Sequence, residues 1–506
     1  MQQTVTIDGK HLRIEDVIAV ARCDALAKVS EEAKQNVHQS REKLLQLLEE
    51  KDIIYGVTTG FGAFGNINIP KDDLKDLQMN LIRSHSSGVG DPLRRDETRA
   101  LMLLRANTLA KGHSGVRYII LDTLMKMINN HIHPIVPEKG SVGASGDLAP
   151  LSHIGLAMIG EGLVEYKGVH TDALDAFTKE GMQPIELDVK EGVALTNGTQ
   201  MMTGIATLTV HDATNLLRAA EVAAAMSLEA LSGIIDAFDK RIHAVRPHSG
   251  QMKCAEHIRE ILSGSKLVQS SSEAVEATEY PQDPYSLRCI PQVFGIVHDT
   301  LEFAEHIVEV EINSATDNPL VFSEKKECIS GGNFHGQPIS AVMDYLGISL
   351  ATIGNFSERR TARMIDARLN RGLPAFLIPE EGKRGIQSGF MTLQYTAAAL
   401  VSENKVLSHP ASVDSIPTSA NFEDFVSMGP IAARKAQEIL NNTEYIVAIE
   451  LLCAAQAVEF RGTDRMGDGT KVAYRLIRKK VPKLIKDRAL YKDVEAVRAM
   501  IKRGEF

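Results

Sequence analysis

Cysteine is scarce in this chain of 506 residues, which carries five cysteines, at positions 23, 254, 289, 328 and 453. Their number is odd, and no two are spaced as Cys-x-x-Cys. A disulfide framework needs an even set of cysteines, and a zinc ribbon needs paired Cys-x-x-Cys motifs. The sequence therefore argues against both classes of protein and predicts reduced thiols, as in a cytosol.

Long runs of basic or apolar residues are also missing. The net charge of −9 is spread along the chain, which gives no electrostatic footprint for nucleic acid or an anionic membrane surface. Residues 1–8 lack a basic region followed by an apolar one, and no uninterrupted apolar stretch reaches membrane-spanning length. We expect a cytoplasmic protein with no nucleic-acid partner, no membrane partner and no metal.

Helical periodicity dominates what is present. With 506 residues and 44% hydrophobic content, two structural regions are expected. The segment 206–237 has the composition of a long buried helix. Residues 1–200 instead alternate Gly-rich turns with shorter elements, among them a helix over 31–51 and a hairpin over 160–169. Apolar stripes at helical spacing run through Phe294, Val297, Leu301, Ala304 and Val308, and through Ile339, Met343, Leu346, Leu350 and Ile353.

These patterns predict a mainly α fold. A loop-rich N-terminal domain is expected over 1–200 and a bundle of long helices over 201–506.

The most informative segment is Ala144-Ser145-Gly146, within the run from Gly140 to Leu151. If a bend brings the Gly146 nitrogen against the Ala144 carbonyl carbon, a five-membered ring closes. Loss of two waters then turns Ser145 into an exocyclic methylidene. Gly146 attacks best because it has no side chain and a free φ angle. The triplet can thus form a 4-methylidene-imidazol-5-one, an electrophile that no ordinary side chain supplies.

Two other interpretations apply to such a segment. Gly and Ser clusters are most often plain turns. A phosphate-binding loop needs Lys and then Ser or Thr after its last Gly, whereas Asp147-Leu148 follows here, so a carboxylate would stand where the anion sits.

The whole run resembles the signature of the aromatic amino acid ammonia-lyases, which include the histidine, phenylalanine and tyrosine lyases and related aminomutases. Further segments resemble the family in its own order and span most of the chain: 55–62 (YGVTTGFG), 197–200 (NGTQ), 282–288 (QDPYSLR), 311–319 (EINSATDNP), 331–335 (GGNFH) and 419–424 (SANFED). The resemblance implies a fumarase/aspartase-like helical architecture and a homotetramer whose active sites are built from several subunits. It also implies a small amino acid as substrate and no dissociable cofactor.

An amino acid lyase needs an electrophile and a base, because ammonia leaves poorly and the β-hydrogen is barely acidic. The resemblance assigns the electrophile to Ala144, Ser145 and Gly146, and the base to Tyr55 on a Gly-flanked loop. Tyr285 matches a second essential position, so the choice between the two tyrosines stays open.

The segment 283–288 is expected to start a helix, with Asp283 as its N-cap and Pro284 in its first position. Tyr285 and Arg288 would share a face. The resemblance assigns Arg288 to the substrate carboxylate, which a guanidinium can bind with two parallel hydrogen bonds. It adds four further positions that contact substrate or the prosthetic group: Asn197, Gln282, Asn313 and Phe334.

Substrate choice depends on two places. Ser84-His85 is similar to the histidine enzymes, whereas tyrosine lyases carry His-Leu there and phenylalanine lyases Phe-Leu. Glu423 agrees, since a carboxylate can accept a hydrogen bond from an imidazole N–H. His85 and Glu423 therefore indicate an imidazole substrate.

Three positions differ from the histidine enzymes. Thr58 stands where those enzymes often carry Asn, and Phe422 and Phe425 replace residues that are usually Gln and His.

Together with His85 and Glu423, the resemblance implies elimination of ammonia from L-histidine to give trans-urocanate. A tyrosine or phenylalanine lyase or an aminomutase remains an alternative within the family, and a catalytically silent helical scaffold remains an alternative outside it.

Overall fold

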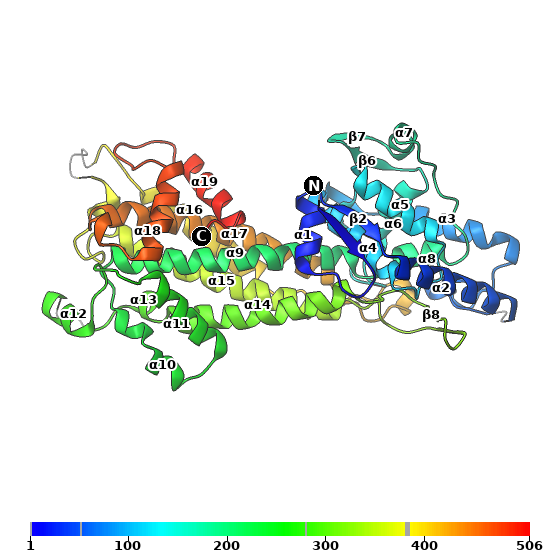
Figure 1. The fold of residues 1–506 in the computed structure, drawn as a ribbon, viewed down its shortest axis with the longest axis horizontal. Coiled ribbons are helices and arrows are strands. Elements are labelled where there is room, and N and C mark those ends of the chain that lie inside the picture. The colour runs from blue at the N-terminus through cyan, green and yellow to red at the C-terminus, as the bar shows by residue number, and fades with distance from the viewer. Residues whose placement is uncertain (1–2, 51–52, 279–280, 380–384) are drawn as a thin grey trace. The chain divides into compact units, whose positions relative to one another are not determined.

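The computed structural model describes residues 3–50, 53–278, 281–379 and 385–506. The chain divides into two compact units, each discontinuous in sequence (Figure 1). The first unit comprises residues 1–208, 305–344 and 410–434, and the second comprises 209–304, 345–409 and 435–506. The sequence predicts a single division near residue 200, and the two domains expected from it stay a prediction.

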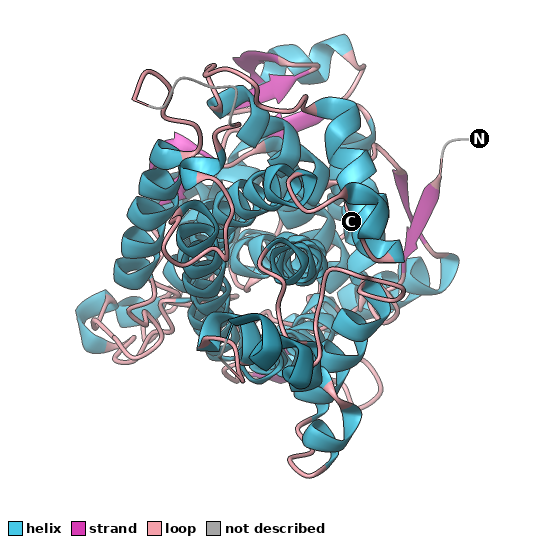
Figure 2. Ribbon diagram, turned by 90° about the vertical axis from the view of Figure 1, so that its left-hand side faces the viewer, coloured by secondary structure: helices cyan, strands magenta, loops and turns pink. Residues whose placement is uncertain are grey.

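Helices make up most of both units, and the strands are short (Figure 2). The helices of the first unit are α1 (Ile14–Arg22), α2 (Glu31–Glu50), α3 (Leu74–His85), α4 (Arg95–Ala110), α5 (Tyr118–Asn129), α6 (Leu148–Met158), α7 (Ala173–Lys179) and α8 (Glu191–Thr196). Its strands are β1 (Thr4–Ile7), β2 (Leu26–Val29), β3 (Val89–Pro92), β4 (Ile132–Pro134), β5 (Pro137–Lys139), β6 (Leu163–Tyr166), β7 (Val169–Asp172), β8 (Leu320–Phe322) and β9 (Glu327–Ile329).

The sheets of the first unit are two or three strands wide. Strand β1 pairs with β2 in parallel, with Thr4 opposite Leu26. The pairs β3–β5 and β8–β9 are antiparallel, and β4, β6 and β7 form an antiparallel sheet of three strands. The expected hairpin over 160–169 is present as β6–β7.

Helix α4 is the core of the first unit and is buried from Glu97 to Ala110. Two of its arginines are buried because they bind carbonyl oxygens at the ends of other helices. Arg99 donates to the Val20 and Ile128 oxygens of α1 and α5, at 2.8 and 3.0 Å. Arg105 donates to the Ala194 and Asn197 oxygens at 2.8 and 2.5 Å. Carbonyls that a helix leaves unpaired at its C-terminal end are thereby satisfied.

The second unit is a helical bundle. Its helices are α9 (Gln200–Ala230), α10 (Lys240–Ala244), α11 (Ser249–Ile261), α12 (Ser271–Thr278), α13 (Tyr285–Arg288), α14 (Ile290–Ile312), α15 (Gln337–Ile365), α16 (Met391–Leu407), α17 (Gly429–Glu459), α18 (Asp468–Lys480) and α19 (Tyr491–Lys502). Helices α9, α14, α15 and α17 each have a part in the first unit and continue into the second. The long helix expected over 206–237 begins earlier and ends at Ala230.

Helices α9, α14, α15 and α17 lie against one another in this unit (Figure 1). The residues predicted to form apolar stripes on α14 and α15 are all buried. Glu450 of α17 binds the buried Arg360 of α15 at 2.5 and 2.8 Å and accepts a hydrogen bond from Ser227 of α9 at 2.6 Å. Because removal of one partner would leave a buried charge unpaired, these contacts hold the helices in one register. The predicted mainly α fold is confirmed.

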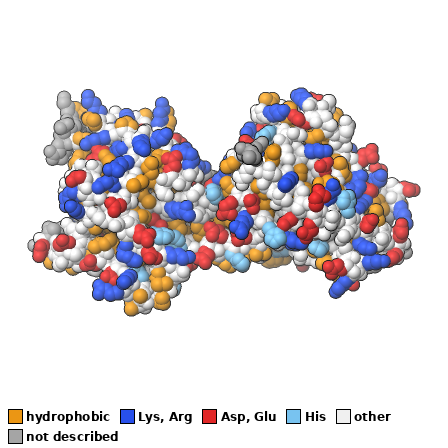
Figure 3. All heavy atoms as spheres, in the orientation of Figure 1, with side chains coloured by type: hydrophobic (Ala, Val, Ile, Leu, Met, Phe, Trp, Pro, Cys, Tyr) orange, Lys and Arg blue, Asp and Glu red, His pale blue; other side chains and the backbone are white. Residues whose placement is uncertain are grey.

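Helix α15 is the one helix in the described ranges that is long and apolar enough to cross a membrane, and 67% of its most apolar window is buried. Burial of this kind is typical of a core helix, so a single such helix is weak evidence for a membrane span. Charged side chains of both signs are interspersed on the face that Figure 3 shows. All five cysteines are free thiols.

Candidate active site

A cavity of about 1170 Å³ lies in the first unit. Most of its walls are apolar and come from segments far apart in the sequence. They include residues 60–69, helix α3, the segment 143–148, the end of α8, the loop 330–335 and the segment 419–426. Seven of the predicted site residues line it: Tyr55, His85, Ala144, Ser145, Asn197, Phe334 and Glu423. Phe422, one of the positions that differ from the histidine enzymes, lines it as well.

The triplet forms a tight turn at the wall of this cavity. The Gly146 N–H donates to the Gly143 oxygen at 3.2 Å, and Ser145 has a φ of 47°, in the left-handed region. Non-glycine residues adopt that region rarely, and its use concentrates at functional sites. The peptide is therefore already bent at the residues that would have to cyclise.

Gly198 holds the other side of this turn. Its N–H donates to the Ser145 oxygen at 3.1 Å, and its own oxygen accepts from the Asp147 N–H at 2.6 Å. A Cβ atom on Gly146 would lie 2.1 Å from the Gly198 oxygen. Glycine is thus required at position 146 by close backbone approach and by a φ of 81° as well as by the expected chemistry.

Asp147 fixes the turn to the start of a long helix. Its Oδ2 accepts hydrogen bonds from the N–H groups of Met201 and Met202, at 2.8 and 3.1 Å. These are unpaired donors in the first turn of α9, so Asp147 caps α9 and not the helix α6 that follows it in sequence. Burial raises the pKa of Asp147 to about 7, although these two hydrogen bonds and the charge of Arg105 act in the opposite direction.

Arg105 supports the C-terminal end of α8. It is fully buried, and burial lowers its pKa to about 10 against the opposing charges of Asp317 and Asp147. Its hydrogen bond to the Asn197 oxygen holds the end of α8, while the Asn197 amide donates to the Asn318 oxygen at 2.9 Å. Asn197 is therefore held at the cavity wall by two segments, Arg105 binding its backbone oxygen and Asn318 its side chain.

Glu423 reaches the triplet from a distant part of the chain. Its Oε1 accepts a hydrogen bond from the Ser145 hydroxyl at 3.4 Å, and its Oε2 accepts one from Thr418 at 2.7 Å. Between them, Ser419, Ala420 and Asn421 all have φ angles of 50–66°. The Ser419 hydroxyl accepts from the Ala63 N–H at 3.1 Å, which ties this strained turn to the loop of Tyr55.

Tyr55 and His85 face the same cavity. The Tyr55 hydroxyl accepts a hydrogen bond from the Gly62 N–H at 3.0 Å, and its ring stacks on Phe422 with centroids 6.5 Å apart. His85 ends helix α3, where its Nδ1 lies 3.0 Å from the Ser84 hydroxyl. Burial lowers the pKa of His85, against the opposing charge of Glu423, which favours a neutral imidazole at neutral pH.

Five predicted residues are not among those that line this cavity: Gly146, Asn313, Gln282, Tyr285 and Arg288. Asn313 directly follows α14, and its side-chain amide accepts a hydrogen bond from the Leu12 N–H at 2.9 Å and donates one to the Leu12 oxygen at 2.8 Å. This side chain is engaged in joining the N-terminal segment to the core. Its contact with substrate stays a prediction.

Gln282, Tyr285 and Arg288 belong to the second unit. Tyr285 lines a smaller cavity of about 470 Å³ there and is 69% exposed. The Arg288 guanidinium lies over its ring, 4.7 Å from the centroid, so the expected shared face is present.

The expected cap of this helix was wrong. Helix α13 begins at Tyr285 after Pro284, and Asp283 instead accepts from the Ile234 N–H at 2.6 Å and binds Arg371 at 2.7 Å. Tertiary partners thus occupy the carboxylate that local sequence rules assigned to the helix start.

Thr418, Asn318 and Arg105 support the site and were not identified from the sequence. Asn318 lines the cavity, and its side-chain oxygen accepts from the Gly331 N–H at 2.8 Å. Asn318 lies inside the motif 311–319, which was a usable signal. No local pattern marks Arg105 as a support for residues 89 and 92 positions later.

Residues 12–479 match the sequence profile described as aromatic amino acid lyase. The chain belongs to the aromatic amino acid lyase family. Among curated relatives, it is 52% identical over 502 residues to "Histidine ammonia-lyase" of Alkaliphilus oremlandii (strain OhILAs), covering 99% of this chain and 97% of that relative. The prediction of an enzyme of the aromatic amino acid ammonia-lyase family is confirmed.

Solved structures of this family share the fold. Tyrosine aminomutase from Streptomyces globisporus is 42% identical, with a TM-score of 0.95 over 99% of this chain and 97% of that one. Histidine ammonia-lyase from Trypanosoma cruzi is 40% identical, with a TM-score of 0.91 over 99% of this chain and 94% of that one. The family's solved members thus include enzymes named for different substrates and reactions.

Proposed function

We propose that this aromatic amino acid lyase removes ammonia from L-histidine and releases trans-urocanate. The observation that carries the proposal is the contact between Glu423 and Ser145 in one cavity, with 3.4 Å between carboxylate and hydroxyl oxygens. A carboxylate at that place can accept a hydrogen bond from an imidazole N–H while the amino group of the same molecule lies at the triplet. Two curated relatives that are 52% identical to this chain are named histidine ammonia-lyase.

We propose further that Ala144-Ser145-Gly146 cyclises into a 4-methylidene-imidazol-5-one. The bent turn, the left-handed φ of Ser145 and the glycine required at 146 all fit that group. When formed, it supplies an electrophile that makes the substrate amine a better leaving group. The side chains of Asn197 and Glu423 lie beside it and would hold the group or the substrate in place.

The remaining residues orient the substrate and move a proton. Glu423 is itself held by Thr418, so its carboxylate has one oxygen fixed and one directed at the triplet. The Tyr55 hydroxyl oxygen accepts a hydrogen bond from the Gly62 N–H, so a backbone donor already faces the oxygen that would carry the phenolate charge before it takes up the β-proton. Tyr55 is our candidate for the group that removes the β-proton, with Tyr285 as the alternative.

A cation for the substrate carboxylate is missing from this cavity. Among the described residues that line it there is no Arg or Lys. Its volume of about 1170 Å³ also exceeds what one amino acid fills. We propose that the chain forms a homotetramer in which the second unit of another copy supplies Tyr285 and Arg288 to the cavity.

Mixed assemblies test this shared site. Ser145→Ala and Arg288→Ala are each expected to be inactive alone and to recover turnover when co-expressed, because some cavities then receive an intact triplet and an intact Arg288. The pair Ser145→Ala with Tyr55→Phe is the matched control, since both residues belong to one cavity. No recovery in mixed assemblies that co-purify through two tags would contradict the shared site.

Parallel assays of purified protein with L-histidine, L-tyrosine and L-phenylalanine test the substrate, with products identified by chromatography. We expect urocanate from L-histidine as the dominant product. A second candidate is a tyrosine lyase or aminomutase, favoured by Phe422 and Phe425, which make the cavity beside Glu423 more apolar. Coumarate or a β-amino acid as the main product would establish that alternative. No turnover with any substrate would indicate the silent scaffold.

A further inference from the structure

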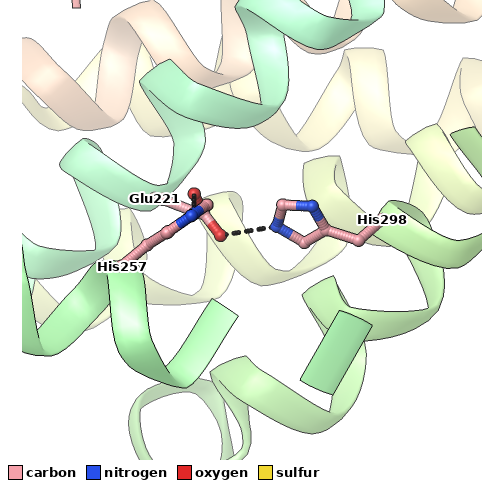
Figure 4. A group of neighbouring side chains, drawn as sticks. All are labelled: Glu221, His257 and His298. Atoms are coloured by element: carbon pink, nitrogen blue, oxygen red, sulfur yellow. Dashed lines mark hydrogen bonds and ion pairs between the residues drawn. The ribbon is translucent and has the colours of Figure 1, made fainter. Parts of the chain in front are cut away.

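A separate group of side chains lies in the second unit, where three helices meet. It consists of Glu221 on α9, His257 on α11 and His298 on α14 (Figure 4). The Nδ1 of His257 lies 3.0 Å from one carboxylate oxygen of Glu221, and the Nε2 of His298 lies 2.8 Å from the other. The two imidazole rings meet edge to face, with centroids 5.7 Å apart. None of the three residues lines the cavity of Ser145.

The burial of this group increases toward the carboxylate. The Glu221 side chain is 3% exposed, that of His298 is 16% exposed and that of His257 is 45% exposed. A buried carboxylate needs a cationic or hydrogen-bonding partner, and here both of its oxygens turn to imidazole nitrogens. The exposed edge of His257 leaves a path from solvent to the donor atoms.

The donor atoms have the spacing of metal ligands. One ligand atom from each residue lies within 4.8 Å of the other two. Ligands about 2.0–2.1 Å from a tetrahedral zinc ion stand about 3.3 Å apart. Each imidazole–carboxylate contact would therefore lengthen by a few tenths of an ångström to admit the ion, and the two imidazole nitrogens, which lie within 4.8 Å of each other, would move to that separation. Two imidazoles with one carboxylate suit zinc and similar transition metals better than magnesium or calcium, which prefer oxygen ligands alone.

We propose that Glu221, His257 and His298 form a binding site for one divalent transition-metal ion, with zinc as the best-fitting ion. The ion joins α9, α11 and α14, and water takes the fourth position on the exposed side. This site lies apart from the residues assigned to ammonia elimination, so its role is to hold the helices together.

Titration of the purified, chelator-treated full-length protein with Zn²⁺ alone, followed by calorimetry, tests the site. We expect one ion per chain, and an affinity at least about tenfold weaker in His298→Gln and in His257→Gln. Co²⁺ in place of Zn²⁺ is expected to give visible absorption bands of a four-coordinate ion, which both variants lose. Turnover of the metal-free variants is expected to stay that of the metal-free parent protein.

His11→Gln is a matched control, because His11 also pairs with a carboxylate, Asp8 at 2.6 Å, but has no second imidazole partner in that contact. It is expected to bind Zn²⁺ like the parent protein. Circular dichroism and size-exclusion profiles confirm that each variant is folded. Absence of stoichiometric binding in the parent protein would overturn the site, as would equal affinity in the parent protein and both histidine variants.

Discussion

The Ser145 hydroxyl lies 3.4 Å from a carboxylate oxygen of Glu423, although 278 residues separate the two in sequence. Glu423 is held in turn by Thr418, at 2.7 Å from its other oxygen. The residue expected to distinguish the substrate ring is thus in contact with the residue expected to become the electrophile. The residue predicted to recognise the substrate and the residue predicted to become the electrophile therefore line the same cavity.

Glu423→Gln tests this contact. The amide keeps the size of the side chain and loses the charge that strengthens a hydrogen bond to imidazole. We expect kcat/KM for L-histidine to fall about tenfold to a hundredfold, with a smaller loss for L-tyrosine. Asp424→Asn, a neutralised neighbour at the rim, is the matched control and is expected to have little effect. Equal losses for both substrates would mean that Glu423 does not recognise the ring.

Ser145→Ala tests the electrophile. The parent protein is expected to have an intact mass lower by two waters than its sequence predicts, with the loss localised to 144–146. The variant keeps the backbone of the turn but has no hydroxyl to eliminate, so both the mass deficit and nearly all turnover are expected to vanish. Ser152→Ala, which removes a buried hydroxyl that donates to the Leu148 oxygen of its own helix at 2.7 Å, is expected to retain both. Turnover by Ser145→Ala would refute the assignment.

Gly146→Ala tests the close backbone approach. The added Cβ would meet the Gly198 oxygen at 2.1 Å, so we expect a lower melting temperature and no mass deficit. Gly181→Ala is a matched control, because Gly181 also has a positive φ, 64°, yet nothing lies within 4 Å of the added atom. That variant carries only the backbone strain of about 1–2 kcal/mol. If both variants lost a similar amount of melting temperature, the positive φ, and not the contact with Gly198, would explain why glycine is needed at position 146.

Asp147 offers a test of the cap on α9. Asp147→Ala leaves the N–H groups of Met201 and Met202 unsatisfied and buried, so we expect it to lower the free energy of unfolding by at least about 2 kcal/mol. Asp147→Asn keeps an acceptor oxygen. Because burial raises the pKa of Asp147 to about 7, the neutral amide resembles a form already populated at neutral pH. In thermal unfolding, the melting temperatures of the parent protein and of Asp147→Asn should both be higher than that of Asp147→Ala. An Asp147→Asn variant as unstable as Asp147→Ala would contradict the cap.

The pH dependence of stability tests the contact between His257 and Glu221 without metal. The hydrogen bond to Glu221 raises the pKa of His257, helped by the charges of Glu260 and Glu256. Glu221 also bonds His298 and faces the buried thiol of Cys254. A histidine with a raised folded pKa stabilises the protein below its unfolded pKa of about 6.5, and this stabilisation is lost as pH rises through the folded value.

In the presence of a chelator, the melting temperature of His257→Gln should therefore fall furthest below that of the parent protein in mild acid. The difference should shrink toward alkaline pH. A difference that stays constant with pH would mean that protonated His257 contributes nothing.

Local sequence was sufficient for much of the fold. The stripes on α14 and α15 were predictable because helical spacing alone places those side chains on one face, and all of them are buried. The hairpin β6–β7 and the helix α2 follow equally from short-range patterns. The family assignment depended on ordered motifs across the chain, and the sequence profile over 12–479 confirms it.

Only the tertiary structure showed which partners the buried charged side chains bind in distant parts of the sequence. Asp283 was expected to cap the helix that follows it, yet its carboxylate accepts a hydrogen bond from the Ile234 N–H. The Asp147 carboxylate likewise binds the start of α9 and not the adjacent α6, because a buried carboxylate pairs with the donors that the packing brings close. Arg105 carries no local signal, and its role appears only where α4 meets the end of α8.

The sequence alone therefore identified the triplet as the candidate for ring closure, since the predicted ring involves three consecutive residues. The contact of Glu423 with that triplet required the folded chain, because covalent neighbours do not set distances between segments hundreds of residues apart.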